Sequence, residues 1–343
     1  MKKKIIISVA AVLLIAVILA LFSALLEPKY ITNPEGRLTS EYYSQSSDND
    51  VIFLGDCEAY ETFVPAVLWE KYGISSYVRG NSQQLIWHSY YILEETFKYE
   101  TPKAVVFNVY ALKYGTPQNE AFNRLAFDNM KWSKTKFDAI NASMMDDEKM
   151  LDYVFPLLRY HSRITELEGD DFKYWFKEPE RATDSGYLMN VGVAPRPDNS
   201  PRERLDYDFS QTSLDYLDRM KKLCDDNGVE LILVKAPTNS SEYYWYDEYE
   251  KQVLEYLEGK DIKYYNLIEK EDEIGLDWNL DTYDYGFHLN VYGAEKTTEY
   301  FGKILSEEHQ IPNRKNEEAL SSKWNERVQE YKDRKEKMEA EEK

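Results

Sequence analysis

The N-terminus carries the feature that most restricts the fold of this chain, an uncharged apolar run from Ile5 to Leu26. A helix rises about 1.5 Å per residue, so a run of this length would reach roughly 33 Å, enough to cross the hydrocarbon core of a membrane. Lysines occupy positions 2 to 4, and positive residues that flank a span remain on the cytoplasmic side. We therefore expect a transmembrane anchor over residues 1–27, a single pass through the cell membrane at residues 5–26, and an extracytoplasmic body.

The competing interpretation is a cleaved signal peptide. Such a peptide has an apolar region of about 7–15 residues and ends in a small-x-small cleavage site. Here the run is longer, and its end reads Phe22-Ser23-Ala24-Leu25-Leu26, without such a site. No cysteine follows directly to which a lipid could be attached. These observations favour the anchor over cleavage.

The acidic composition restricts the possible partners. The chain has 62 Asp and Glu against 42 Lys and Arg, a formal net charge of −20. Nucleic acid requires a basic face on its partner, so this balance argues against nucleic-acid binding. The two cysteines, Cys57 and Cys224, are too few for a disulfide-rich exported fold, so stability must come from a hydrophobic core.

Short apolar runs alternate with helical patterns after a polar stalk at residues 28–49. We expect strands at residues 51–54, 75–78, 104–109, 230–234 and 263–267, and helices at residues 63–72, 83–99, 213–227, 246–257 and 293–306. Buried apolar strands that are separated by helices indicate parallel pairing, with helices on both faces of the sheet. The sequence therefore predicts an α/β domain with a mostly parallel sheet over residues 50–312.

Two further segments lie outside this alternation. An insertion of about residues 111–210 follows the third strand, and it contains a helical stretch at residues 148–167 that Pro156 should kink or split. The tail at residues 313–343 is rich in charge and poor in apolar residues, so we expect a solvated helix there.

Polar residues follow the ends of the expected strands, which is where ligands bind in open α/β sheets. The first strand leads into Gly55-Asp56-Cys57-Glu58, the second into Arg79-Gly80-Asn81-Ser82, and the third carries Asn108 and Tyr110. A further polar block, Asp281 to Asn290, stands immediately before the last helix and contains His288. These blocks are the candidates for a functional site.

Two of these blocks carry a family resemblance. Strand-Gly-Asp-Cys at the front and Asp-x-x-x-His-Leu-Asn-x-x-Gly-Ala at the back resemble the SGNH/GDSL hydrolase superfamily, over residues 51–110 and 229–305. The closer likeness is to an exported, membrane-anchored branch that includes polysaccharide O-acyltransferases and the D-alanine transfer protein of teichoic acids. The resemblance implies a flavodoxin-like three-layer α/β/α sandwich. Two positions depart from the family pattern: Cys57 stands where the family has serine, and Asp284 precedes His288 by four residues, where the family spacing is three.

The resemblance also implies catalytic roles. Cys57 would be the nucleophile, His288 its base, and Asp284 or Asp281 the acid that orients the imidazole. A helix N-terminus and a histidine can lower the pKa of a thiol from about 8.5, so we expect a reactive thiolate. The alternative is that Cys57 is a small buried residue at the end of a strand. Cys224, on an amphipathic helix, is expected to serve packing alone.

An oxyanion hole would complete such a site. The resemblance implies donors from the backbone N–H groups of Cys57 and Gly80, together with the side chain of Asn81 or Asn108. The sequence shows neither metal-ligand spacing nor a phosphate-binding glycine loop, so we expect no metal and no cofactor.

Positive residues gather in the insertion. Arg124, Arg159, His161 and Arg163 could line a cover over the strand ends that binds a polar or anionic substrate, with Lys235 at the end of the fourth strand. The same residues would equally suit a salt-bridged helix, and the sequence leaves both interpretations open.

By resemblance, the expected function is acyl-ester chemistry on a cell-envelope glycan, as an O-acyltransferase or an esterase. The expected partners are an envelope polysaccharide or an acylated carrier, with a membrane-embedded acyltransferase as a further candidate. Transfer is favoured because the anchor would keep the body beside a membrane acyl donor. A second interpretation is a non-catalytic binding or scaffold subunit of an envelope-assembly complex, which the departures at Cys57 and Asp284 would fit.

Overall fold

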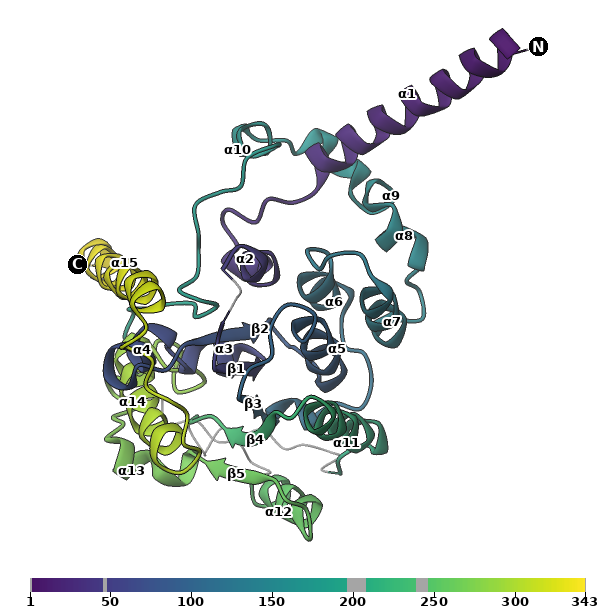
Figure 1. Cartoon of the computed structure of the whole chain (residues 1–343). Helices are drawn as coiled ribbons and strands as arrows, with labels where there is room; N and C mark the ends of the chain where they lie inside the picture. Colours follow the sequence, from purple (N-terminus) through teal and green to yellow (C-terminus); the bar gives the residue numbers. More distant parts are fainter. Residues whose placement is uncertain (1, 46–47, 196–207, 239–245, 343) are drawn as a thin grey trace.

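A five-stranded parallel sheet forms the centre of the body (Figure 1). The computed structural model describes residues 2–45, 48–195, 208–238 and 246–342. The strands are β1 (Val51–Gly55), β2 (Ser76–Gly80), β3 (Ala104–Asn108), β4 (Glu230–Lys235) and β5 (Lys263–Asn266). They lie in the order β2-β1-β3-β4-β5, and every neighbouring pair is parallel. The α/β class and the parallel sheet are thus confirmed.

The two faces of the sheet bury alternate side chains of each strand, as the pleat requires. In β1, Ile52 and Leu54 belong to one core cluster, and Val51 and Phe53 belong to another. Helices α5 (Ile86–Thr96), α11 (Gln211–Asp226) and α12 (Tyr246–Leu257) cover the first face. Helices α3 (Cys57–Thr62), α4 (Pro65–Tyr72), α13 (Glu271–Ile274) and α14 (Val291–Glu307) cover the second. The body therefore has three layers.

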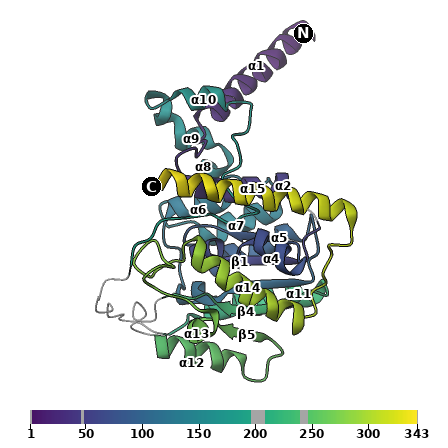
Figure 2. The ribbon, with the colours of Figure 1, turned by 90° about the vertical axis from the view of Figure 1, so that its left-hand side faces the viewer.

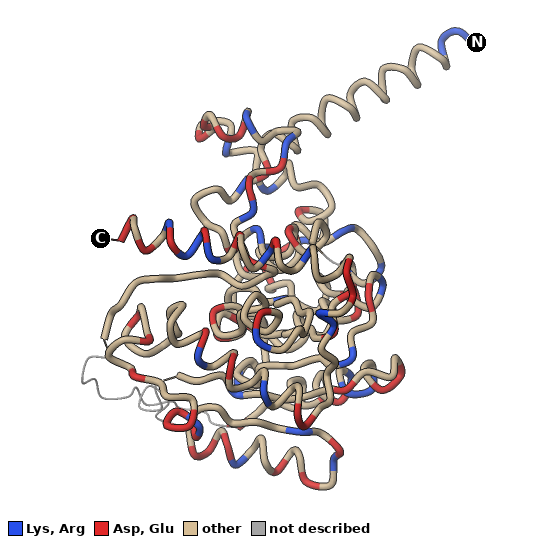
Figure 3. Tube along the Cα trace, turned by 60° about the vertical axis from the view of Figure 1, so that its left-hand side comes forward, with Lys and Arg blue, Asp and Glu red and all other residues tan. Residues whose placement is uncertain are grey.

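The N-terminal helix α1 (Lys2–Leu26) projects away from the body (Figures 1 and 2). It is long and apolar enough to cross a membrane, and none of its most apolar window is buried in the structure. Its course is free of charge beyond the lysines at its start, whereas acidic and basic residues are spread over the body (Figure 3).

The segment expected to be a stalk is partly built into the body. After the short helix η1 (Pro34–Arg37), helix α2 (Leu38–Gln45) packs against β2. Tyr42 is fully buried there, with the guanidinium carbon of Arg79 lying 3.7 Å from its ring centroid. Because α2 presents Leu38 and Tyr42 to the core, the interpretation of residues 28–49 as a simple spacer is incomplete.

The C-terminal tail forms the helix α15 (Glu318–Glu342), but it is not a solvated helix. It packs against α4, and the rings of Trp324 and Trp69 are stacked at 5.6 Å. Its buried residues, at intervals of four, four and three, are Leu320, Trp324, Val328 and Tyr331. These four apolar side chains are enough to bind the helix to the body. The many charged residues between them made this apolar pattern hard to recognise in the sequence.

This docking gives a stability prediction. Trp324 is 1 % exposed, so Trp324→Ala should lower the free energy of unfolding by about 3–5 kcal/mol, because the transfer free energy and the packing of a buried indole are both lost. Trp132→Ala is the matched control, since Trp132 is 50 % exposed. Urea unfolding of both variants provides the measurement. Equal, small effects would contradict the docking of α15.

The described part of the insertion after β3 begins with a series of short helices. It contains η2 (Val109–Lys113), α6 (Glu120–Phe127), α7 (Lys134–Ser143), α8 (Met150–Val154), α9 (Pro156–Tyr160), η3 (His161–Thr165) and α10 (Gly169–Lys173). Pro156 is the first residue of α9, so it splits the expected helix at residues 148–167. Helix α7 packs against α5, whereas α9, η3 and α10 contact α1.

Candidate active site

Cys57 lies at the carboxyl end of β1, at the point where the strand order reverses between β1 and β3. Such a switch point is where open α/β sheets bind ligands. Asp56 caps α3 by accepting a hydrogen bond from the backbone N–H of Glu58 at 3.3 Å. Gly55 has a φ of +156°, and a Cβ there would lie 2.9 Å from the Cβ atoms of Ala59 and Asn108. The turn that presents Cys57 therefore requires glycine.

The structure places Cys57, His288 and Asp284 in a continuous chain of hydrogen bonds. Cys57 Sγ lies 3.0 Å from His288 Nε2, and His288 Nδ1 lies 2.6 Å from Asp284 Oδ2. His288 and Asp284 stand in the loop before α14, which a bridge between Thr282 and Leu289 closes. A nucleophile, an imidazole and an orienting carboxylate in this order form the arrangement of a catalytic triad.

The four-residue spacing between Asp284 and His288 is accommodated by the loop. Tyr285 has a φ of 68° and Gly286 a φ of 96°, so two successive residues adopt left-handed conformations. The chain then returns, and Asp284 Oδ1 accepts a hydrogen bond from the backbone N–H of His288 at 2.8 Å. Asp281, the alternative acid, pairs with Lys296 at 2.6 Å. The departure from the family spacing therefore does not prevent contact.

A second carboxylate, Glu61, also faces the imidazole and was not predicted. Its Oε2 lies 3.6 Å from His288 Nδ1, and its Oε1 accepts a hydrogen bond from the Tyr283 hydroxyl at 2.9 Å. Burial raises the pKa of Glu61 to about 7, although His288 opposes the shift. Glu61 is four residues after Cys57, so both lie on the same face of α3, but the helix was expected at residues 63–72 and α3 itself was not predicted.

The electrostatics of the site differ from the expected reactive thiolate. Burial, followed by the negative charge of Asp56, raises the pKa of the Cys57 thiol to about 11, against the opposing effect of His288. Burial lowers the pKa of His288, but Cys57, the hydrogen bond to Asp284 and the charge of Glu61 together raise it well above 6.5. Because the pKa of His288 is raised, the imidazole is protonated on both nitrogens until the pH exceeds that pKa. Once the ring is neutral, the protonated thiol can donate to Nε2 while Nδ1–H donates to Asp284. The expectation of a low thiol pKa is wrong, since the carboxylates and the burial outweigh the imidazole.

A buried polar network lies beside the nucleophile and engages two predicted site residues. Asn108 Nδ2 lies 3.3 Å from Asp56 Oδ1 and 2.8 Å from Glu58 Oε2, so both amide hydrogens have carboxylate acceptors. Lys235 Nζ pairs with Glu58 at 2.7 Å, and both side chains are buried. These contacts differ from the oxyanion donor expected at Asn108 and the substrate ligand expected at Lys235. The reason is Glu58, whose buried charge requires compensation.

Of the two other predicted oxyanion donors, Asn81 is already hydrogen-bonded, and Gly80 lies close to the turn before Cys57. Asn81 donates to Gln84 at 2.8 Å and accepts from Thr39 at 3.2 Å, so its amide belongs to a neighbouring network. A Cβ at Gly80 would lie 3.1 Å from the carbonyl oxygen of Gly55, which shows how closely β2 approaches the turn before Cys57. The backbone donors at Cys57 and Gly80 remain the predicted oxyanion hole.

The insertion residues predicted to bind substrate have partners away from Cys57. Arg124 and Arg159 both pair with Glu120 at 2.8 Å. His161 is exposed, and Arg163 donates to the last carbonyl of α1. Arg159 on α9 and His161 and Arg163 on η3 come from helices that contact α1 (Figure 2), whereas Arg124 is on α6 in the body. The contacts favour the salt-bridged interpretation of the insertion over a substrate-binding cover.

Comparison with known proteins adds no family assignment, since no protein-family model and no curated protein sequence matches the chain. The likeness to SGNH/GDSL hydrolases therefore continues to depend on the motif residues.

Cys224, by contrast with Cys57, is fully buried on α11, as its packing role predicts.

Proposed function

We propose that this chain is a membrane-anchored, extracytoplasmic acyl-ester enzyme of the SGNH/GDSL type, with Cys57 in the place of serine. The observation that carries the proposal is the line from Cys57 through His288 to Asp284, with separations of 3.0 and 2.6 Å. The strand order β2-β1-β3-β4-β5 supports the flavodoxin-like sandwich of that superfamily. Helix α1 supports a place at the membrane, where an acyl donor and an envelope glycan would meet.

The chemistry follows from a protonated thiol beside an imidazole. Cys57 Sγ attacks the acyl carbonyl carbon while its proton passes to His288 Nε2, and Asp284 stabilises the imidazolium. The tetrahedral intermediate collapses to a thioester on Cys57, and Nε2 returns the proton to the departing oxygen. A sugar hydroxyl or water then gives its proton to Nε2 and attacks the thioester. The new ester or free acid leaves, and Sγ recovers the proton.

Detection of the thioester tests this proposal. The full chain in detergent, incubated with p-nitrophenyl acetate, should gain one acetyl group, and peptide mass spectrometry should place it on Cys57. Neutral hydroxylamine should remove it, since thioesters are cleaved under these conditions. His288→Ala should form the adduct more slowly by roughly 10²–10⁴-fold, the usual contribution of a general base.

Two outcomes would count against the proposal. Acetylation that spreads over surface lysines and spares Cys57 would show an unselective reagent and no activated nucleophile. An unchanged rate in His288→Ala would show that the short contact has no chemical role. Either result would favour the non-catalytic scaffold interpretation.

A further inference from the structure

The segment Met150–Phe176, here termed the foot, exposes an unusual amount of apolar surface for the body of an acidic protein. It comprises α8, α9, η3 and α10 with the residues that follow. Its exposed large apolar side chains are Leu151, Val154, Phe155, Leu158, Ile164, Phe172 and Phe176. Phe176 is 76 % exposed and stacks on Trp175 at 4.8 Å. A concentration of exposed apolar side chains of this kind marks an interaction surface.

The foot is attached to the membrane-proximal part of α1. The indole N–H of Trp175 donates to the carbonyl of Leu21 at 3.1 Å, and Arg163 donates to the carbonyl of Leu26. Leu21 lies five residues before the end of α1, which corresponds to about 7–8 Å along the helix axis. Figures 1 and 2 show α9 and α10 beside the end of α1 that faces the body. The foot therefore overlaps the last turns of the apolar helix.

We propose that the foot rests on the extracytoplasmic face of the membrane and inserts its apolar side chains at the boundary between headgroups and acyl chains. Interfacial segments penetrate about 5–10 Å, which matches the overlap with α1. Tryptophan is also favoured at this level, where its ring is apolar and its N–H is satisfied. The inference rests on the membrane-spanning role proposed for α1 and is independent of the chemistry at Cys57.

Charge identifies the driving force of this contact. Five acidic residues of the foot, Asp152, Glu166, Glu168, Asp170 and Asp171, stand against three basic ones, Arg159, Arg163 and Lys173. Attraction to anionic lipid therefore cannot drive the contact, and burial of apolar area must supply it. The foot should consequently bind zwitterionic bilayers at least as well as anionic ones.

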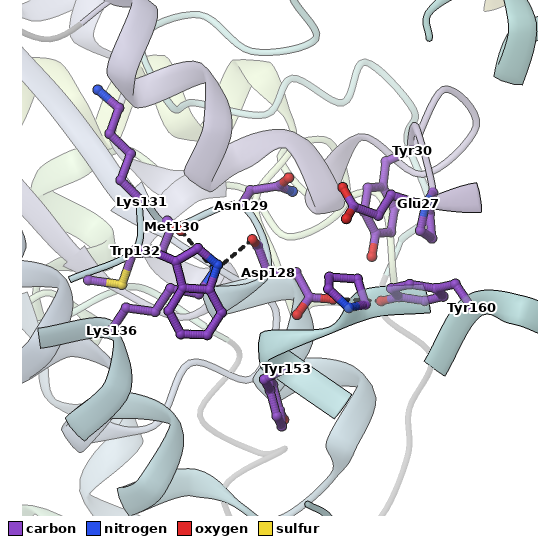
Figure 4. Close-up of a pocket in the computed structure, with 12 residues that line it drawn as sticks. Glu27, Tyr30, Asp128, Asn129, Met130, Lys131, Trp132, Lys136, Tyr153 and Tyr160 are labelled. Atoms are coloured by element: carbon purple, nitrogen blue, oxygen red, sulfur yellow. Dashed lines mark hydrogen bonds between the residues drawn. The ribbon is translucent and has the colours of Figure 1, made fainter. Parts of the chain in front are cut away.

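The foot is also fixed to the body, so its contact would set the height of the sheet above the membrane. The Tyr160 hydroxyl donates to Asp128 at 2.6 Å, which joins α9 to the end of α6. Beside this bond lies a polar cavity of about 270 Å³ whose walls include Glu27 and Tyr30 from the segment after α1 (Figure 4). Lys136 also lines this cavity, and its ammonium group donates to the carbonyls of Asp128 and Met130.

Lipid contact can be measured with an environment-sensitive label. Single cysteines for a nitrobenzoxadiazole probe would replace Phe155, Phe176, Val12 and Leu254 in the full chain carrying Cys57→Ser, and buried Cys224 would remain. Val12 lies within α1 and serves as the lipid-embedded reference. Leu254, 52 % exposed on α12 at the far end of the body, is the matched aqueous control (Figure 1). The proteins would be reconstituted in phosphatidylcholine vesicles, with and without phosphatidylglycerol.

We expect labels at Phe155 and Phe176 to emit at shorter wavelength than the label at Leu254 and to be quenched by doxyl-labelled lipid. The effect should not require phosphatidylglycerol. Labels at Phe155 and Phe176 that behave like Leu254 while Val12 is quenched would overturn the inference and leave the anchor intact. An unquenched label at Val12 would reject the anchor itself.

Discussion

Cys57→Ala should reduce the rate of acyl transfer or ester hydrolysis by more than about a thousandfold, because in the proposed mechanism Cys57 carries the acyl intermediate. Cys57 Sγ is the atom that His288 Nε2 approaches at 3.0 Å, and the other cysteine, Cys224, is buried on α11. Steady-state rates with an activated ester would measure the loss. Circular dichroism would verify that the variant remains folded.

The variant Cys57→Ser tests whether the site can use a hydroxyl nucleophile in place of the thiol. The thiol pKa of about 11 implies that the nucleophile is protonated in neutral solution, as a serine hydroxyl is. A site that must remove a proton during attack should accept serine, so Cys57→Ser should keep a rate clearly above that of Cys57→Ala. Cys224→Ala is the matched control and should leave the rate unchanged. Equal inactivity of the serine and alanine variants would contradict a serine-like mechanism, and full activity of Cys57→Ala would exclude Cys57 as the nucleophile.

The sheet could be predicted because its strands leave a strong local signal. Val51–Gly55 and Ala104–Asn108 are short apolar runs that end in small or polar residues, and burial on both faces requires such runs. The approach of Cys57 to His288 was predictable from the order of the two motifs. The left-handed turn at Tyr285 and Gly286, which lets Asp284 reach the imidazole, could not be predicted, because tyrosine rarely adopts a positive φ.

The partners of the polar side chains were beyond the sequence. Asn108 and Lys235 do lie at the strand ends, but buried Glu58 engages both of them. The sequence alone does not show which of two nearby buried carboxylates a lysine will pair with. The arginines of the insertion show the same limit, because Glu120 accepts from both Arg124 and Arg159. Competition among neighbours decides these roles, and that competition exists only in the folded chain.

The second large effect concerns pH. In the proposed mechanism only neutral His288 can accept the thiol proton, so kcat/KM should rise as pH increases through the pKa of His288. That pKa lies well above 6.5, despite burial, because of Cys57 and the carboxylates of Asp284 and Glu61. The rising limb of the parent profile should therefore lie above pH 6.5. Asp284→Asn removes the charge that stabilises the imidazolium, so the limb should move to lower pH.

The same substitution should lower the maximal rate by roughly 10²–10⁴-fold, since the amide no longer holds the imidazole in the required tautomer. Glu61→Gln is the matched control: its carboxylate is 3.6 Å from Nδ1, against 2.6 Å for Asp284, so the shift should have the same direction and a smaller size.

Stability gives an independent measurement of the same pair. A group whose pKa is raised on folding stabilises the fold fully below its unfolded pKa, and the contribution disappears as pH rises through the folded pKa. The parent should therefore exceed Asp284→Asn in unfolding free energy most clearly near pH 6, and the difference should shrink at alkaline pH. A difference that grows with pH, or a rate profile that Asp284→Asn leaves in place, would show that Asp284 does not control the protonation of His288.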